Sequence, residues 1–343
     1  MKEILAFLLK KCYTVPNINE KEIFMVTAVV ILGVLLILTA AVSFIPYRMG
    51  FYADTKKRDV SHDVPDREQY KRVRERLLSY IEELDARPYE TVTIRSHDGK
   101  RLTARYYHQA DGAPLDIGFH GYKSHSVRDF CGGSRLSFAL GHNLLLPDQR
   151  AHGGSDGYTI SFGIKERLDC LDWIRYANDR FGEDTRLCIY GVSMGAATVL
   201  MATELELPAN LRAVIADCPY SSPKAILRKV ACENMGLPFR LFYPFLRLGT
   251  LLYGHFRFDP TVSAVNAVKK SPVPILLIHG EDDRFVPCDM SREIRDANPE
   301  KVTLVTFPEA GHALSYPLDP QGYESAVLDF LRSHTDLPIP DGR

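Results

Sequence analysis

Apolar residues cluster most densely near the start of the chain. Residues 23–47 contain no Asp, Glu, Lys or Arg, and a helix that spans a bilayer needs about 20 predominantly apolar residues. The run predicts a transmembrane helix over residues 23–47, preceded by a tail over residues 1–22. Pro46 is expected to end the helix, and Tyr47 and Arg48 are expected to anchor it at the membrane interface.

A cleaved signal peptide is the competing interpretation, because Ala41-Val42-Ser43 resembles a small-residue cleavage site. The apolar run exceeds the usual signal core of about 7–15 residues and follows a long tail, which favours a retained helix. We therefore expect a single-pass protein of the cell membrane. The positive-inside rule leaves the side of the following domain open, because basic residues nearly balance across the run. They are Lys10, Lys11 and Lys21 before it, and Arg48, Lys56, Lys57 and Arg58 after it.

Residues 48–88 have a more polar pattern. A linker comes first, and residues 66–85 then repeat apolar positions every three or four residues, as an amphipathic helix does. These positions are Tyr70, Val73, Leu77, Ile81 and Leu84. Because the other face carries charges of both signs, we expect this helix to pack on the following domain rather than on a membrane surface.

From residue 89 onward, apolar strands alternate with helices, which is the pattern of a mostly parallel sheet with helices on both faces. Asp98-Gly99 predicts a hairpin turn and therefore an antiparallel start to the sheet. One α/β domain is expected over residues 89–335, with a tail over residues 336–343. The predicted strands cover residues 90–95, 102–108, 115–119, 143–147, 187–191, 213–216, 273–279 and 302–306. The predicted helices cover residues 127–140, 164–180, 196–206, 288–297 and 320–334.

The composition excludes some classes of function. The 343 residues include 42 basic and 43 acidic residues, and without a basic stripe nothing indicates a nucleic-acid partner. The seven cysteines are scattered and contain no C-x-x-C pair, so they predict neither a disulfide framework nor a metal site. No obligate protein partner is evident from the sequence.

The motif Gly191-x-Ser193-x-Gly195 follows an apolar strand and precedes a helix-forming run. In this setting a G-x-S-x-G motif is a nucleophile elbow, in which small flanking residues allow a sharp turn and expose the serine hydroxyl. The helix that begins there directs its N-terminus at the serine. The backbone N–H of Met194 is therefore expected to form one half of an oxyanion hole.

A nucleophilic serine needs a histidine as base and a carboxylate that orients the histidine. His312 lies in the loop between the last predicted strand and the last predicted helix, at the sheet edge where Ser193 is expected. The carboxylate should also follow a strand, and Asp283 meets this requirement best. Its neighbours Glu281 and Asp282 can be excluded only by geometry. The chain order Ser, Asp, His is one of the known orders of a catalytic triad.

Residues 89–334 resemble the α/β-hydrolase superfamily, in its serine hydrolase branch. Four segments carry this resemblance: residues 120–122, 148–155, 191–195, and 279–287 with 311–312. The chain resembles in particular the membrane-anchored bacterial hydrolases related to dienelactone hydrolases and prolyl oligopeptidases. The resemblance implies an α/β-hydrolase fold with an eight-stranded, mostly parallel sheet and no cofactor. It also implies that the N–H of Tyr122 completes the oxyanion hole with Met194, and it favours Asp283 as the triad acid.

Other polar residues near these motifs have a structural interpretation. His120, His152 and His279 resemble loop residues that fix the backbone rather than transfer protons. Lys123, His125 and Arg128 lie near the oxyanion loop, where they either meet an anionic part of the substrate or form a solvated face.

Residues 221–271 form a connection much longer than the usual 2–6 residues or so and are expected to be a helical lid. Its large apolar residues either form an acyl-chain pocket over Ser193 or only dock the insertion on the sheet. The expected function is hydrolysis of an ester or thioester through Ser193, His312 and Asp283, with an acyl substrate that can be lipid-like. An aminopeptidase would use the same residues. An inactive membrane-tethered binding protein is the non-enzymatic alternative, but it predicts the loss of a catalytic position, and all three are present.

Overall fold

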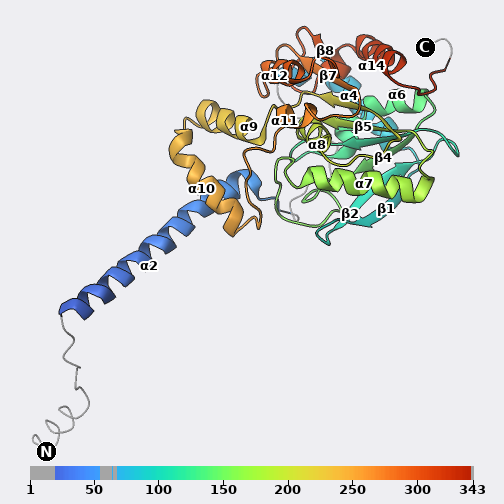
Figure 1. Ribbon diagram of the computed structural model, residues 1–343. Coiled ribbons are helices and arrows are strands. Elements are labelled where there is room, and N and C mark those ends of the chain that lie inside the picture. The colour runs from blue at the N-terminus through green and yellow to red at the C-terminus, as the bar shows by residue number, and fades with distance from the viewer. Residues whose placement is uncertain (1–19, 55–63, 65–67, 341–343) are drawn as a thin grey trace, which may run out of the picture.

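A mixed eight-stranded sheet forms the centre of the domain (Figure 1). We describe it from a computed structural model that covers residues 20–54, 64 and 68–340. The tail over residues 1–19, the basic cluster of residues 56–58 and the end of the chain at 341–343 lie outside the described residues. The strands are β1 (Glu90–Arg95), β2 (Arg101–Tyr107), β3 (Leu115–Phe119), β4 (Asn143–Pro147), β5 (Leu187–Val192), β6 (Leu211–Asp217), β7 (Ile275–Gly280) and β8 (Val302–Phe307).

The strand order is β1-β2-β4-β3-β5-β6-β7-β8, and all neighbours from β4 to β8 are parallel. β2 is antiparallel to both β1 and β4. The Asp98-Gly99 turn closes the first hairpin as predicted: Gly99 has a positive φ of 81°, which glycine adopts without strain. The prediction of a mostly parallel eight-stranded sheet in an α/β hydrolase fold is confirmed.

Helices cover both faces of the sheet, and the strands alternate their side chains between the two layers. Ile117 and Ile189 face one layer, while Leu146 and Ile215 face the other. The first layer contains α7 (Glu166–Phe181), α8 (Met194–Ala202), α11 (Ala264–Val268) and α12 (Asp289–Ala297). The second layer contains α4 (Arg74–Asp85), α5 (Ser126–Phe130), α6 (Gly133–Ala139), α13 (Ser315–Leu318) and α14 (Pro320–His334).

Two predicted helices are interrupted in the structure. The amphipathic segment forms α3 (Glu68–Lys71) and α4 with a break at residues 72–73, and the helix predicted over residues 127–140 is split into α5 and α6. At the second break the chain packs closely on α13, because a β-carbon at Gly132 would overlap the ring of Tyr316. This contact joins parts of the chain that are far apart in the sequence, so a local pattern does not reveal it.

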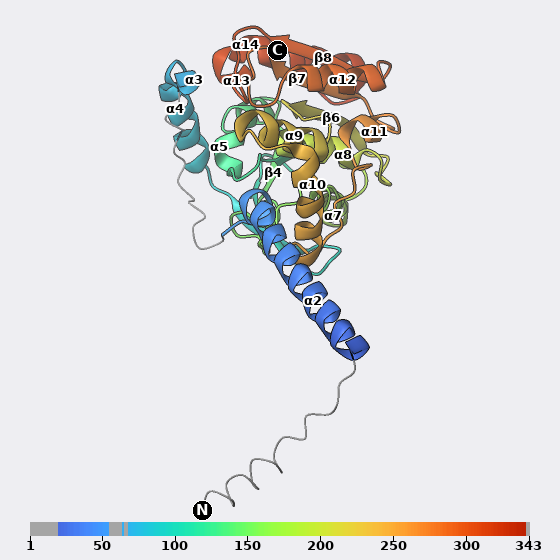
Figure 2. The ribbon, with the colours of Figure 1, turned by 90° about the vertical axis from the view of Figure 1, so that its left-hand side faces the viewer.

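The insertion over residues 221–271 contains α9 (Pro223–Lys229), the π-turn η3 (Val230–Asn234), α10 (Phe239–Leu252) and α11. α10 does not lie over the sheet edge. It packs along the last turns of α2 (Glu20–Pro46), the long apolar helix that projects from the domain in Figure 1. Figure 2 shows α2 and α10 on a different side of the domain from α3 and α4.

The end of α2 is built into the domain rather than joined to it by a linker. Residues 47–51 form a π-turn, η1 (Tyr47–Phe51), and Phe51 is fully buried against Phe162, Phe256 and Phe258. The Tyr47 hydroxyl shares a hydrogen bond of 2.8 Å with the Thr159 hydroxyl. The expectation of a polar linker from residue 48 is therefore wrong for residues 48–51, because they form η1 and Phe51 packs into the domain.

Candidate active site

The turn around Ser193 has the strained geometry of a nucleophile elbow. Ser193 lies between β5 and α8 with φ 55° and ψ −112°, a conformation that non-glycine residues rarely adopt. A β-carbon at Gly191 would overlap the backbone of Gly195, and one at Gly195 would overlap the carbonyl oxygen of Phe119. Both glycines are therefore required for the close packing of the turn against β3.

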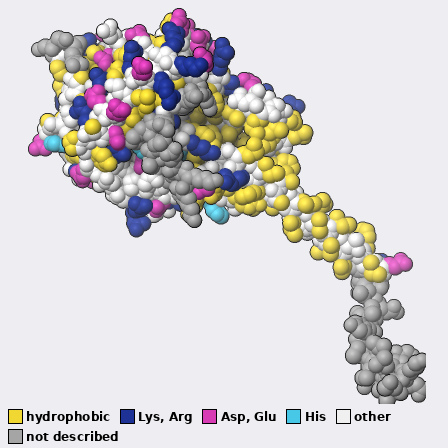
Figure 3. All heavy atoms as spheres, turned by 180° about the vertical axis from the view of Figure 1, so that it is seen from behind, with side chains coloured by type: hydrophobic (Ala, Val, Ile, Leu, Met, Phe, Trp, Pro, Cys, Tyr) yellow, Lys and Arg dark blue, Asp and Glu magenta, His cyan; other side chains and the backbone are white. Residues whose placement is uncertain are grey.

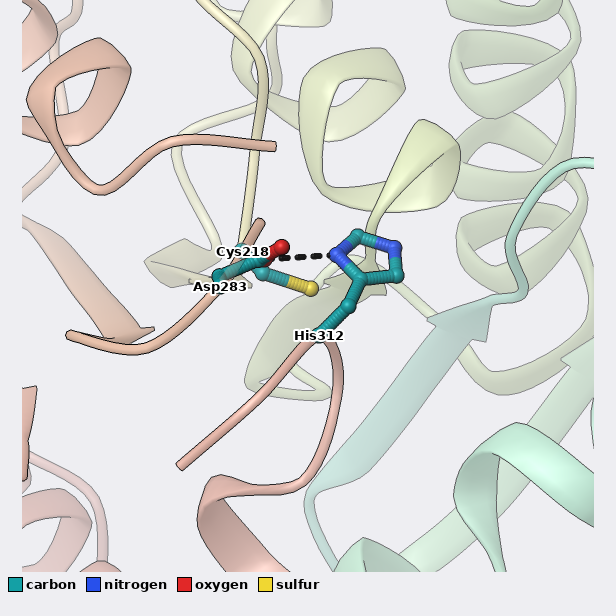
Figure 4. Close-up of side chains that lie close together, drawn as sticks. All are labelled: Cys218, Asp283 and His312. Atoms are coloured by element: carbon teal, nitrogen blue, oxygen red, sulfur yellow. Dashed lines mark hydrogen bonds and ion pairs between the residues drawn. The ribbon is translucent and has the colours of Figure 1, made fainter. Parts of the chain in front are cut away.

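His312 and Asp283 complete a chain of hydrogen bonds with Ser193. The Nε2 atom of His312 lies 2.9 Å from the Ser193 Oγ, and its Nδ1 atom lies 2.6 Å from Asp283 Oδ2. Figure 4 shows the imidazole and the carboxylate of this pair facing each other. The side chains come from the loops after β5, β7 and β8, which end at the same edge of the sheet.

The surroundings of Asp283 keep its carboxyl ionised. Burial alone would raise its pKa, but hydrogen bonds from His279 and His312 outweigh burial and hold the pKa well below its usual range. Its other oxygen accepts from the backbone N–H groups of Phe285 and Val286, at 2.9 and 2.8 Å. A fixed negative charge thus faces the Nδ1 of His312.

The neighbouring carboxylates are placed differently. Asp282 is exposed, and Glu281 accepts a hydrogen bond from the Thr306 hydroxyl at 2.7 Å. Of the three acidic residues left open by the sequence, Asp283 alone contacts His312 among the hydrogen bonds of the described residues.

The backbone N–H groups of Tyr122 and Met194 lie beside Ser193, in the loop after β3 and at the first residue of α8. The first N–H groups of a helix have no partner within the helix, and in the described part of the chain neither amide meets an acceptor. The loop is held by Asp129, which accepts from the Gly121 N–H at 2.7 Å and from the Ser124 hydroxyl at 2.5 Å. Neither amide is therefore occupied by an acceptor from the described residues.

The three histidines interpreted as structural all bond to the backbone. The Nε2 of His152 accepts from the Lys123 N–H at 2.9 Å, and the Nε2 of His120 accepts from the Gln149 N–H at 3.0 Å. The Nε2 of His279 lies 2.8 Å from the Val286 carbonyl oxygen. Burial lowers the pKa of His120, so this imidazole stays neutral. These side chains fix the loops that carry Tyr122 and Asp283.

The other polar residues near the oxyanion loop also have partners in the protein. The Lys123 ammonium lies 5.0 Å from the ring centre of Tyr122, and the imidazole of His125 caps α5. Arg128 donates to the Ser124 hydroxyl at 2.5 Å and lines the cavity described next. Arg128 is therefore the one of these three that borders the space beside Ser193.

A cavity of about 460 Å³ adjoins Ser193 and His312. It extends between the sheet and the helices of the second layer, away from α10. Its apolar walls include Phe130, Leu136, Leu144, Tyr190, Ile215, Leu314 and Val327. Among the described residues, none from the insertion lines it. The large apolar residues of the insertion therefore do not form the pocket over Ser193 that was one of the two expectations; they pack on α2 and the domain.

One buried carboxyl lines this cavity. Asp217 lies at the end of β6 and interacts with the side chain of Tyr323, but its Oδ1 atom has no hydrogen-bond partner among the described residues. Burial raises its pKa to about 6. Its backbone oxygen accepts from the Ser193 N–H at 2.8 Å. No sequence motif points to this residue, because its position is defined by the cavity.

A second residue that the sequence did not single out for its side chain is Tyr122. Its hydroxyl donates to the carbonyl oxygen of Gly50 at 2.8 Å, and its ring stacks on Phe162. Burial raises the pKa of Tyr122 to about 12, so the hydroxyl remains a donor. The loop that supplies an oxyanion amide is thus joined directly to the turn that follows α2.

Two clusters have the residue types of a metal site. Cys218 lies beside Asp283 and His312 (Figure 4), and His97 lies beside Asp169 and Asp172. Burial raises the pKa of Cys218 well above its usual value, so its thiol is a poor ligand. In the second cluster, Asp169 is already bound by the buried guanidinium of Arg150 through two hydrogen bonds. Neither cluster has the free anionic ligands that a metal ion requires.

Comparisons with known proteins show the family of this chain. Residues 118–326 match the model of the alpha/beta hydrolase family. The chain is 28% identical over 201 residues to the uncharacterised protein YqkD of Bacillus subtilis, which covers 59% of this chain and 66% of that protein. It is 24% identical over 245 residues to the human protein ABHD12B, which covers 63% of this chain and 60% of that protein.

Solved structures with the same fold include esterases. The esterase Pf2001 of Pyrococcus furiosus superimposes with a TM-score of 0.59 and 24% identity, covering 74% of this chain and 95% of that one. Est1E of Butyrivibrio proteoclasticus, solved with ferulic acid bound, has a TM-score of 0.54 and 22% identity, covering 72% and 98%. At these identities the superpositions show a shared fold.

Proposed function

Because the chain belongs to the alpha/beta hydrolase family, we propose that it is a membrane-anchored serine hydrolase that cleaves an acyl ester or thioester. The observation that carries the proposal is the hydrogen-bonded chain from Ser193 through His312 to Asp283. The esterase Pf2001, a solved structure of the same fold, supports the reaction class.

In the proposed mechanism, Ser193 attacks the acyl carbon while His312 takes the hydroxyl proton at Nε2. Asp283 remains ionised and stabilises the imidazolium that forms. The N–H groups of Tyr122 and Met194 donate to the developing oxyanion. His312 then protonates the leaving alcohol or thiol, and a water molecule deprotonated by His312 hydrolyses the acyl-enzyme.

The cavity beside Ser193 supports a substrate with an apolar acyl group. Its volume of about 460 Å³ lies within the range of roughly 300–1,000 Å³ that is usual for small-molecule sites. Its walls are mainly apolar on the side of α6 and α14. A medium or long acyl chain can fill this space while its carbonyl carbon lies at Ser193.

We further propose that α2 is retained and spans a membrane. The helix is long and apolar enough to do so, a test that a signal sequence also passes. Its contacts support retention: Ser43 is fully buried against α10, and the Tyr253 hydroxyl donates to the Ala40 carbonyl oxygen at 2.8 Å. Cleavage after Ser43 would remove both contacts.

The test uses the full chain in detergent, because Tyr47 and Phe51 belong to the packed structure. We expect a fluorophosphonate probe to label the native chain and not Ser193→Ala, and we expect Ser193→Ala to lower ester hydrolysis by roughly four orders of magnitude or more. Ser315→Ala is the control, because its buried hydroxyl has no hydrogen-bond partner to lose. Labelling that survives in Ser193→Ala would reject the nucleophile.

A further inference from the structure

α10 presents an apolar face that the described part of the chain covers only in part, since Phe245 and Leu248 are half-buried. Leu241, Phe245, Leu248 and Leu252 follow one another at helical spacing, and we call them the α10 stripe. Leu241 is 70% exposed and Leu252 is 43% exposed. The opposite face is satisfied, since Leu246 and Thr250 are buried within the domain. An exposed apolar stripe of this kind indicates an interaction surface.

The position of the stripe relative to α2 indicates what covers it. Every large apolar side chain of α2 from Ile23 to Leu38 is at least half exposed. Charged residues at Glu20 and Lys21 mark the far end of this stretch. At a rise of about 1.5 Å per residue, residues 23–38 extend only about 24 Å, whereas the hydrocarbon core is about 30 Å thick.

The remaining length must come from residues that α10 already contacts. Four more residues reach Val42, and the contact with α10 includes Ala40 and Ser43. Any tilt of α2 moves the boundary further toward the domain. α10 therefore crosses α2, around Gly249, at the depth where the acyl chains meet the headgroups. Figure 3 shows apolar side chains continuing from the projecting helix onto the body of the protein.

The composition of α10 fits this depth. The helix contains Arg240 and Arg247 and no acidic residue, and both arginines are exposed. Apolar and basic residues without acidic ones are typical of helices that lie in the interface of a bilayer with anionic lipids. α4, by comparison, carries charges of both signs.

We infer that α10 is a second membrane contact, which seats the α10 stripe at the boundary between acyl chains and headgroups of the bilayer that α2 spans. This inference rests on the proposed membrane anchoring. It gives the insertion a role in holding the domain close to the membrane surface, so that α2 and α10 together fix the height of the active site above the lipid.

The chain offers a direct test, because its single tryptophan, Trp173, is buried and contributes a constant background. The full-length variants Leu241→Trp, Leu32→Trp and Tyr89→Trp are reconstituted in vesicles of phosphatidylcholine and phosphatidylglycerol. Some vesicles contain phospholipid brominated near the top of the acyl chain, and others contain phospholipid brominated near its end. Leu32 lies in the middle of α2, and Tyr89 is an exposed residue just before β1.

We expect the added tryptophan of Leu241→Trp to lose most of its fluorescence with bromine near the top of the chain and less with bromine near the end. Leu32→Trp should show the opposite order, and Tyr89→Trp should lose nothing. If Leu32→Trp is quenched while Leu241→Trp behaves like Tyr89→Trp, the inference about α10 is overturned and the anchor stands. A second copy of the chain covering the stripe would give this result. If Leu32→Trp is not quenched, the proposed anchor itself fails, and the inference fails with it.

Discussion

Large apolar side chains lie on two sides of Ser193, and the two sides differ in what these side chains do. On the side of α6 and α14, Leu136, Tyr190 and Val327 line an open cavity. On the side of α2 and α10, Phe51, Phe256 and Phe258 fill the space with ring contacts of about 6 Å between centroids. Similar residue types therefore line an open cavity on one side and form closely packed contacts on the other.

The difference shows that apolar density does not by itself identify a substrate pocket. The insertion over residues 221–271 contains seven aromatic residues, but none of them is among the described residues that line the cavity. We infer a division of roles between the two sides: the cavity side binds the acyl group, and the α2 side attaches the protein to the membrane. The predictions below test this division.

The largest effect is expected at Asp283, because hydrolysis depends on this residue whichever side of Ser193 binds the acyl group. Asp283→Asn removes the charge that orients and stabilises His312, and should lower kcat/KM by about three to four orders of magnitude. The loss should be the same for short and long acyl chains, because the substitution leaves the cavity unchanged. Hydrolysis of nitrophenyl esters of graded chain length measures both quantities.

Asp282→Asn is the matched control, because the residue is adjacent, acidic and exposed. It should leave the rate unchanged. Equal losses in the two variants would mean that the general charge of the loop matters rather than the hydrogen bond to His312.

Asp217, which lines the cavity, should make the stability of the folded protein depend on pH. The pKa of Asp217 in the folded state is about 6, whereas the ordinary value of an aspartate is about 3.9. The protonated carboxyl favours the folded state, so this contribution to stability is fully present below about pH 4 and is lost as the pH rises through 6. Asp217→Asn should therefore have the native Tm near pH 4 and a higher Tm above pH 7. Above pH 7 the free energy of unfolding should rise by at most about 3 kcal/mol. Thermal unfolding across this range measures the difference. A difference that stays constant with pH would contradict the burial argument.

The sequence predicted the parts of the site that local patterns encode. The glycines of the elbow, the strand ends before Asp283 and His312, and the Asp98-Gly99 hairpin all depend on neighbours within a few residues, and the structure contains each of them. The cavity and the bond between Tyr122 and Gly50 depend on segments about 70 residues apart or more. The breaks at Gly132 and at residues 72–73 were missed because hydrophobic periodicity continues across both.

A substitution at Gly249 tests the packing between α2 and α10. A β-carbon there would overlap the Ser43 carbonyl oxygen, so Gly249→Ala should push α10 from α2 and destabilise the detergent-solubilised chain by about 1–3 kcal/mol. Alanine is otherwise favoured over glycine in a helix by about 1 kcal/mol, so a lower Tm would identify the crossing as the cause. Gly33→Ala is the control, because its β-carbon meets open space. Hydrolysis of an acetate ester should remain in both variants. A change in chain-length preference in Gly249→Ala would break the proposed division between the two sides.

Leu136 gives the smallest and most selective effect. It lines the cavity, whereas Leu140, one turn further on, is equally buried and does not. Leu136→Phe should shorten the space for an acyl chain and lower the ratio of long-chain to acetate hydrolysis by about tenfold, since a few methylene groups in a pocket are worth 1–3 kcal/mol. Leu140→Phe adds the same volume to the same layer and should leave the ratio unchanged, although both variants lose some stability. Because the acetate rate reports the intact Ser193 and His312 in each variant, a fall in the ratio that is confined to Leu136→Phe places the acyl chain on the side of α6. Equal ratios in the two variants would instead indicate that the acyl chain binds on the side of the insertion.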